Sequence, residues 1–293
     1  MYARTASARA AALLGAAALL LPGTAAQAAP AAGPHDEPTV IAHRGASAYA
    51  PENTLAAVDL ADRMGFAWVE NDVHRTKDGE LVVVHDDSLA RTTNVEQVFP
   101  GRSPWKIKDF TAAEIAELDA GSWFGPEFTG ARVPTLKQYV NRVERNHQKL
   151  LLEIKKPEIY PGIEKDTLRV LRKEGWLDRH HVKHKLVIQS FGANSVKAVH
   201  KQRPDVTTGF LGTPPVADLP KYAKFTDQIN PTHTSLTADY VAAVHKLKGA
   251  HGKQLRVNTW TVNTAAAATR VDGFGVDGII TNNPDIVRDA VSR

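Results

Sequence analysis

From Thr39 onward, short apolar runs alternate with segments of helical periodicity, and this alternation limits the fold more than any other feature. The runs that predict strands are Thr39–His43, Ala67–Val73, Leu81–His85, Leu150–Lys155, Leu186–Ser190, Thr208–Leu211, Gln228–Asn230, Leu255–Thr261 and Gly278–Thr281. The segments that predict helices are Asn53–Met64, Leu136–Asn146, Gly162–Glu174, Asn194–Lys201, Ala238–Leu247, Ala265–Val271 and Asp285–Val291. Strand–helix alternation over about 250 residues favours an α/β fold, a closed (β/α)8 TIM barrel of parallel strands.

The strand candidates outnumber the places in such a barrel. Nine runs compete for eight places, so at least one assignment is expected to be wrong. The weakest are the short run Gln228–Asn230 and the closely spaced pair Ala67–Val73 and Leu81–His85.

One connection is much longer than the others. Residues 86–149 number 64 and contain a helical pattern over Thr111–Leu118, with aromatic residues at Trp105, Trp123, Phe124 and Phe128. We expect a small insertion after the third strand, over about residues 86–134. Because loops that follow barrel strands lie at the active-site face, the insertion is either a lid or substrate wall, or a cap that stabilises the barrel.

The first 28 residues have the layout of a secretory signal peptide. Arg4 and Arg9 precede an apolar run over residues 10–21, and Ala26-Gln27-Ala28 fits a small-residue cleavage site. The run is short for a bilayer-spanning helix, which needs about 20 residues, so a cleaved leader is favoured over a membrane anchor. We therefore predict cleavage near Ala28, secretion, a flexible arm over residues 29–38 and the barrel over residues 39–293.

The composition excludes several classes of chemistry. The chain contains no Cys, which excludes disulfides, thiolate metal sites and Cys nucleophiles. A formal net charge of +4 over 293 residues is too small to indicate a nucleic-acid partner. It indicates no particular oligomeric state.

Chemically active residues follow the first four predicted strands. His43 and Arg44 end the first, Glu70 and Asp72 the second, His85 the third, and Glu153 and Lys155 the fourth. These ends should converge on the C-terminal mouth of the barrel, with residues two apart on the same face. Three converging carboxylates would repel one another unless a cation held them, and an all-oxygen set selects Ca²⁺ or Mg²⁺. The two cationic residues suit a phosphate group, and the two His suit acid/base catalysis.

Each of these residues has an ordinary explanation when it is taken alone. A Glu-x-Asp pair is usually solvated or ion-paired, and a single strand-end His is more often satisfied locally than catalytic. Arg44 and Lys155 could simply pair with Glu70 or Asp72. The recurrence of the pattern at four strand ends favours a site.

A series of short motifs occurs in order along nearly the whole mature chain. They are His43-Arg44-Gly45, Pro51-Glu52-Asn53-Thr54, Glu70-x-Asp72-Val73, Thr76-Lys77-Asp78-Gly79, His85-Asp86, Leu89-x-Arg91-Thr92-Thr93, Val133-Pro134-Thr135-Leu136, Glu153-x-Lys155, Gln189-Ser190-Phe191, Trp260-Thr261-Val262-Asn263 and Asp277-Gly278-Ile279-Ile280-Thr281-Asn282. This ordered set closely resembles the glycerophosphodiester phosphodiesterase family. The resemblance implies a TIM barrel that hydrolyses glycerophosphodiesters to an alcohol and sn-glycerol 3-phosphate. It also implies a divalent metal and a small insertion domain after strand three.

The resemblance also implies residue roles. By position, Glu70, Asp72 and Glu153 match the metal ligands, His43 and His85 match the acid/base pair, and Arg44 and Lys155 match the phosphate-contacting cations. Trp260 matches a residue near the substrate, and Gln189 and Phe191 are candidates for contact with the substrate or with its neighbours. Asn53 is either a site residue or a helix cap. The chain departs from the family pattern at Asn71 and over Asn230–Ser235, so the role of that loop is left open.

In the expected reaction, one His deprotonates the nucleophile and the other protonates the leaving alkoxide. We expect His43 to be the acid and His85 the base. The nucleophile is either the substrate's glycerol 2-hydroxyl, acting through a cyclic phosphate, or water. One divalent cation is expected, with Ca²⁺ favoured over Mg²⁺ because an exported protein meets Ca²⁺, which tolerates irregular carboxylate sites. Choline, ethanolamine, glycerol, inositol and teichoic-acid chains all fit as the leaving alcohol.

Three other functions fit parts of the pattern. A sphingomyelinase D-like phospholipase would give a cyclic phosphate and would approach membranes through the insertion's aromatic residues. A secreted barrel that only binds phosphodiesters or wall polymers would need no acid/base pair. Metal-dependent sugar isomerisation is disfavoured by Arg44 and Lys155. The expected partner is a small-molecule glycerophosphodiester, with no nucleic acid and no stable membrane anchor.

Overall fold

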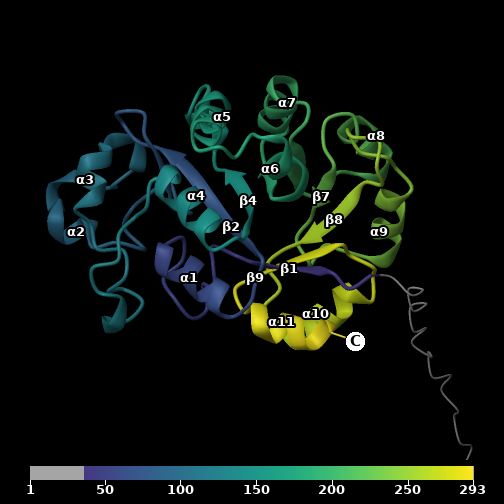
Figure 1. Cartoon of the computed structure of the whole chain (residues 1–293), viewed down its shortest axis with the longest axis horizontal. Helices are drawn as coiled ribbons and strands as arrows, with labels where there is room; N and C mark the ends of the chain where they lie inside the picture. Colours follow the sequence, from purple (N-terminus) through teal and green to yellow (C-terminus); the bar gives the residue numbers. More distant parts are fainter. Residues whose placement is uncertain (1–35, 293) are drawn as a thin grey trace, which may run out of the picture. The chain divides into compact units, whose positions relative to one another are not determined.

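The computed structural model describes residues 36–292, whose strands form one closed sheet with helices around it (Figure 1). The strands are β1 Thr39–Ala42, β2 Trp68–Arg75, β3 Leu81–Val83, β4 Lys149–Ile154, β5 Leu186–Ser190, β6 Thr207–Leu211, β7 Gln228–Asn230, β8 Arg256–Thr259 and β9 Gly278–Thr281. The helices are α1 Leu55–Arg63, α2 Val95–Val98, α3 Ala112–Ala116, α4 Leu136–Arg145, α5 Ile163–Lys173, α6 Arg179–His184, α7 Ala193–Gln202, α8 Leu219–Tyr222, α9 Ala238–His245, α10 Ala265–Asp272 and α11 Pro284–Val291.

Eight of these strands close into a parallel barrel. The order is β1-β2-β4-β5-β6-β7-β8-β9, and β1 closes the ring because it pairs in parallel with both β2 and β9. The predicted TIM barrel is therefore confirmed.

All nine predicted strands form, but one of them is not part of the barrel. β3 runs antiparallel to β2, with Val83 opposite Val73 and Leu81 opposite Arg75. The short run Gln228–Asn230, one of the weakest candidates, is a barrel strand that pairs in parallel with β6 and β8. The insertion thus follows the third strand in chain order, but it lies between the second and third strands of the barrel.

The outer helices form because their apolar residues recur on one face. On α4, Leu136, Tyr139, Val140 and Val143 are buried at helical spacing, and they belong to one core cluster with Leu150 and Leu152 of β4. Thr135 and Gln138 begin this helix with a reciprocal capping box. Helices that are anchored in this way hold the strands in register.

The barrel interior changes character along its length. Ile41, Leu151, Val187 and Ile280 form a separate buried apolar cluster. Two residues further along β4 and β5, the paired residues are Glu153 and Gln189, so the interior becomes polar toward the C-terminal ends of the strands. Residues two apart on a strand share a face, so Glu153 and Gln189 point into the same interior as Leu151 and Val187.

The insertion has a core of its own. Eight of its residues pack into one buried cluster with Val82 of β3 and with Val84: Leu89, Val95, Ile107, Phe110, Ile115, Leu118, Ala120 and Val133. A segment with its own core can hold side chains rigidly against the barrel mouth. The contacts described below bring side chains of residues 86–91 of this segment beside the barrel mouth.

The predicted signal peptide and most of the predicted arm lie outside the described residues. Within residues 36–292, no helix combines the length and the apolar character needed to cross a bilayer.

Candidate active site

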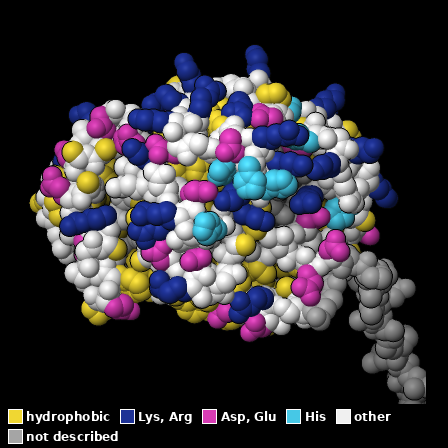
Figure 2. All heavy atoms as spheres, viewed as in Figure 1, with side chains coloured by type: hydrophobic (Ala, Val, Ile, Leu, Met, Phe, Trp, Pro, Cys, Tyr) yellow, Lys and Arg dark blue, Asp and Glu magenta, His cyan; other side chains and the backbone are white. Residues whose placement is uncertain are grey.

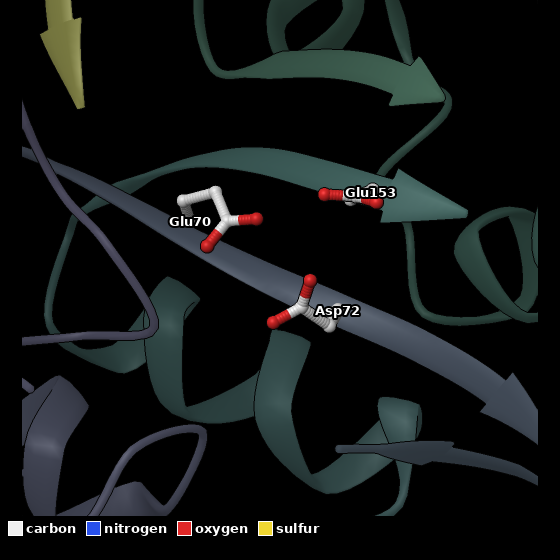
Figure 3. A group of neighbouring side chains, drawn as sticks. All are labelled: Glu70, Asp72 and Glu153. Carbon is white, nitrogen blue, oxygen red and sulfur yellow. The ribbon is translucent and has the colours of Figure 1, made fainter. Parts of the chain in front are cut away.

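Three buried carboxylates meet at the C-terminal end of the barrel. Glu70 and Asp72 lie two residues apart on β2, and Asp72 is paired in register with Glu153 of β4. Figure 3 shows the three carboxylates turned toward one another, and one oxygen from each lies within 4.8 Å of the others. All three side chains are buried.

This concentration of negative charge leaves the carboxylates poorly neutralised by the protein alone. Burial, followed by the charges of Asp72 and Glu153, raises the pKa of Glu70 well above its usual range. Burial and Asp72 raise the pKa of Glu153 to about 7. Asp72 Oδ1 accepts no hydrogen bond and is buried. A hard divalent cation fits this all-oxygen set, because it would supply the missing positive charge and a partner for that oxygen.

Two cationic side chains lie beside the carboxylates. Arg44 Nε lies 3.3 Å from Asp72 Oδ2, and Lys155 Nζ lies 2.9 Å from Glu153 Oε1 and 3.5 Å from Asp72 Oδ1. Burial alone would raise the pKa of Asp72, but Lys155 and Arg44 outweigh it and lower that pKa below its usual range. Asp72 is therefore the member of the three that stays charged.

Two residues near Arg44 adopt a left-handed backbone. Arg44 has φ 57° and Asn53 has φ 60°, both unusual for residues other than Gly. These conformations aim the Arg44 N–H at Glu70 Oε2, 3.1 Å away, and the Asn53 side-chain amide at Asp72 Oδ2, 2.9 Å away. The cap of α1 is Thr54, so Asn53 is a residue of the site rather than a helix cap.

His43 follows β1 and is held by a neutral partner. Its Nδ1 lies 2.6 Å from the side-chain oxygen of Asn282, and its Nε2 lies 3.8 Å from Glu70 Oε2. Since an amide oxygen only accepts, Nδ1 carries the proton and Nε2 is left free. Burial and the Arg44 charge lower the pKa of His43 to about 3, so the ring is neutral near pH 7.

His85 lies at the site, but it does not follow a parallel barrel strand as predicted. β2 continues past the barrel rim, and β3 returns antiparallel, so that the Val84 N–H donates to the Asp72 carbonyl at 3.0 Å. His85 comes next in the chain and follows the end of this returning strand rather than the end of a parallel barrel strand. Its Nδ1 lies 2.7 Å from Asp86 Oδ1, a carboxylate that stabilises the protonated ring. Burial nevertheless lowers the pKa of His85 from its usual value.

A network of ion pairs joins His85 to Arg44. Arg91 Nε donates to Asp86 Oδ2 at 2.7 Å, and its two terminal nitrogens donate to the two oxygens of Glu52 at 2.8 Å each. Glu52 in turn accepts from Arg44 Nη1 at 2.9 Å. The candidate site residues did not include Glu52, Asp86 or Arg91, although all three lie in quoted motifs. Their position inside these family motifs is the sequence signal that identifies them as candidate site residues.

The predicted residues surround one cavity of about 80 Å³. Its lining contains every predicted site residue except Asp72: His43, Arg44, Glu70, His85, Glu153, Lys155, Gln189, Phe191 and Trp260. Phe191 and Trp260 stack edge to face at 5.4 Å, and Lys155 Nζ lies 5.7 Å from the Phe191 ring. Asn230 supports this wall, because its side-chain amide donates to Gln189 Oε1 at 2.8 Å and its carbonyl accepts from Trp260 Nε1 at 2.8 Å. The cavity thus combines anionic, cationic, acid/base and aromatic groups.

Known proteins resemble this chain in sequence and in fold. Residues 43–286 match the glycerophosphoryl diester phosphodiesterase family. The chain is 34% identical to the glycerophosphodiester phosphodiesterase of Bacillus subtilis, over 86% of this chain and 85% of that protein. It is 33% identical to the enzyme of the same name from Caldanaerobacter subterraneus, over 87% of this chain and 98% of that protein. A phosphodiesterase from Oleispira antarctica, solved with its product sn-glycerol 3-phosphate, superposes with a TM-score of 0.73 at 29% identity, over 87% of this chain and 97% of that one.

Proposed function

The chain belongs to the glycerophosphodiester phosphodiesterase family, and on that premise we propose that it hydrolyses glycerophosphodiesters with one divalent cation and two catalytic His residues. It is a glycerophosphodiester phosphodiesterase, so its substrate is a small-molecule glycerophosphodiester. The proposed products are an alcohol and sn-glycerol 3-phosphate. The observation that carries the proposal is the single cavity that brings both His side chains to the carboxylates Glu70 and Glu153.

The carboxylates of Glu70, Asp72 and Glu153 are the proposed ligands of the cation. A divalent cation held there would neutralise the phosphodiester and would stabilise the charge that develops on its oxygens. We favour Ca²⁺ over Mg²⁺, because a secreted enzyme meets Ca²⁺ and because Ca²⁺ accepts irregular carboxylate geometry. Arg44 and Lys155 line the cavity and supply further positive charge for the phosphate.

The partners of the two His residues favour His43 as the base and His85 as the acid, which is the reverse of the roles expected from the sequence. Burial and the Arg44 charge keep His43 neutral, and Asn282 holds the ring proton on Nδ1, so the free Nε2 suits the base that takes the proton of the nucleophile. His85 has the carboxylate of Asp86 at 2.7 Å, which favours its protonated form and suits the acid that protonates the leaving alkoxide. Either the substrate's 2-hydroxyl or a water molecule serves as the nucleophile in this scheme.

One assay separates this function from its alternatives. Glycerophosphocholine with added Ca²⁺ should release choline and sn-glycerol 3-phosphate. A cyclic phosphate as the end product would favour a sphingomyelinase D-like enzyme, and no turnover would favour a binding protein.

The metal is tested on the same substrate. EDTA should abolish turnover, Ca²⁺ should restore it, and Glu153→Gln should remain inactive at any Ca²⁺ concentration. Lys137→Gln, an exposed change on α4, is the matched control and should behave like the wild type. Full activity after exhaustive dialysis against EDTA would contradict the metal assignment.

A further inference from the structure

The barrel has a second cavity at the end opposite to the active site. It measures about 300 Å³, and its walls include the first residues of β1, β2, β4, β5, β6, β7 and β8. A larger space of about 750 Å³ adjoins it and shares five lining residues with it: Lys183, Thr207, Gln228, Arg256 and Asp277. Together they form one open concavity at the N-terminal floor of the barrel.

Five cationic side chains line this concavity, and we call them the floor cations: Lys149, Arg179, Lys183, Lys253 and Arg256. In the part of the chain that the structure describes, none of the five has an Asp or Glu oxygen within 4.0 Å. Figure 2 shows His side chains gathered among Lys and Arg side chains near α6, on the face that it draws. The floor therefore presents five cationic side chains that lack a carboxylate at ion-pair distance among the described residues, although four Asp residues also line it: Asp36, Asp205, Asp227 and Asp277.

Three of the four acidic residues of the floor bind groups other than the floor cations, and one of them, Asp205, lies 2.6 Å from Arg203. Asp277 accepts from the Val257 N–H at 2.7 Å and lies 2.9 Å from His245 Nε2. Asp227 accepts from the Thr208 N–H at 3.1 Å and from the His251 N–H at 3.0 Å. Within residues 36–292, the ion-pair partners of Asp205, Asp227 and Asp277 are Arg203, His251 and His245 rather than the floor cations.

The same charges act on a neighbouring side chain. His184 lines the smaller cavity, and the pKa of its ring is lowered by desolvation and then by the positive charges of Lys183, His180, Lys149 and Lys253. An anion bound here would relieve this repulsion.

The spread of the floor cations selects an extended ligand over a compact one. They come from four parts of the chain: Lys149 begins β4, Arg179 and Lys183 lie on α6, Lys253 lies before β8, and Arg256 begins β8. One phosphate group could contact only a few of them. A flexible chain with regularly spaced negative charges could contact all five and would release counterions at each contact.

We propose that the barrel floor is a binding surface for a flexible polyanion of the polyphosphate type, distinct from the active site. The apolar cluster of Ile41, Leu151, Val187 and Ile280 separates the two ends, because Ile280 lines the active-site cavity and the other three line the floor. A polyanion on the floor leaves the mouth open to substrate. The surface would hold the enzyme on a polyanionic material while it continues to turn over small phosphodiesters.

The test uses long-chain inorganic polyphosphate as the probe and the purified enzyme as the receptor. The triple variant Lys149→Gln/Lys183→Gln/Arg256→Gln removes three floor cations. The control Lys77→Gln/Lys108→Gln/Lys173→Gln removes the same number of exposed charges elsewhere. Both should hydrolyse glycerophosphocholine like the wild type, which reports on folding and separates this test from that of the proposed function.

The floor variant should bind polyphosphate at least tenfold more weakly at about 0.1 M salt, and the slope of log K against log salt should fall by about 2, since flexible chains lose about 0.7 per contact. The control should lose less than twofold. Equal losses in both variants would overturn the proposal, as would no wild-type binding. Competition by inorganic phosphate at the same total phosphate would also overturn it, because it would indicate a site for one phosphate only.

Discussion

Replacing Arg91 with Ala should impair catalysis although Arg91 does not touch the cavity. Its guanidinium bridges Asp86 and Glu52 with hydrogen bonds of 2.7 to 2.8 Å, and these two acids hold His85 and Arg44. The hydrogen bonds that Arg91 donates to Glu52, and then those to Asp86, raise the pKa of Arg91, so it stays charged. Without it, Asp86 and Glu52 lose their shared counterion, and both His85 and Arg44 lose a fixed neighbour. Arg91 is thus a positioning residue.

The size of the effect follows from the contacts. One charge-assisted hydrogen bond contributes about 1.5–3 kcal/mol net, and 1.4 kcal/mol corresponds to a tenfold change in rate. Arg91 is 45% exposed, so water replaces part of what is lost and the lower half of that range applies. We expect kcat to fall by about 10- to 40-fold, below the roughly 100- to 10,000-fold expected when His85 itself is removed.

Chemical rescue distinguishes positioning from a loss of folding. Added guanidinium at millimolar concentration should restore part of the kcat of Arg91→Ala, because the free cation can occupy the space between the two acids. Arg132→Ala is the control: Arg132 donates to the carbonyls of Glu117 and Leu118 within the same insertion and makes no contact with the network. The control should keep the wild-type kcat. An Arg91→Ala enzyme with kcat within twofold of the wild type, or a loss that guanidinium does not restore, would refute this reasoning.

Four further expectations can be checked separately. His85→Ala should lose much more activity on an alkyl glycerophosphodiester than on a p-nitrophenyl phosphodiester, whose leaving group needs no acid. His43→Ala should be poor on both substrates. The opposite pattern in initial rates would support His43 as the acid and His85 as the base, as expected from the sequence. Gly45→Ala should lower the free energy of unfolding by about 2–4 kcal/mol in urea titrations, because Gly45 has φ +80° and a Cβ there would lie 2.6 Å from the Ala57 backbone. Asp119→Asn should cost about 1 kcal/mol near pH 7. Burial would raise the pKa of Asp119, but the N–H groups of Ser122, Gly130 and Gly121 lower it from 3.8 to about 2. The stability that the Asp119 carboxylate contributes is therefore full above pH 4 and is lost toward pH 2. Melting curves of the variant and the wild type should converge there. N-terminal sequencing of the secreted protein should read from Ala29, and a cell-bound chain that retains Met1 would contradict cleavage.

The barrel and its three carboxylates could be predicted from the sequence because both follow from periodicity. A strand repeats every two residues, so Glu70 and Asp72 must share a face, and parallel strands must end at one rim. The apolar–helical alternation then brings Glu153 to the same rim. None of these steps needs knowledge of a loop, and the structure pairs Asp72 with Glu153 in register.

The residues around the carboxylates depend on features that periodicity does not describe. The apolar run Leu81–His85 predicts a strand whose end reaches the mouth like the others, whereas β3 runs antiparallel and carries His85 back from beyond the rim. Asn230 ends a strand of only three residues, too short for an alternating pattern to show which face it occupies. Asn282 lies 239 residues from its partner His43 in the sequence, so no local pattern could relate them.

The left-handed backbone at Arg44 and Asn53 explains why short motifs, and not periodicity, indicate the residues around the carboxylates. A positive φ at Arg44 and at Asn53 costs about 1–3 kcal/mol each, and such strain persists only where the surrounding contacts hold it. Here the contacts are with the carboxylates themselves, since the Arg44 N–H binds Glu70 and the Asn53 amide binds Asp72. Gly45 follows Arg44 with φ +80° and lies so close to the Ala57 backbone that the turn leaves no room for a side chain. The loop after β1 is therefore shaped by the carboxylates on β2, and the short motifs His43-Arg44-Gly45 and Glu52-Asn53 reflect that shape rather than any periodicity of the strands beside them.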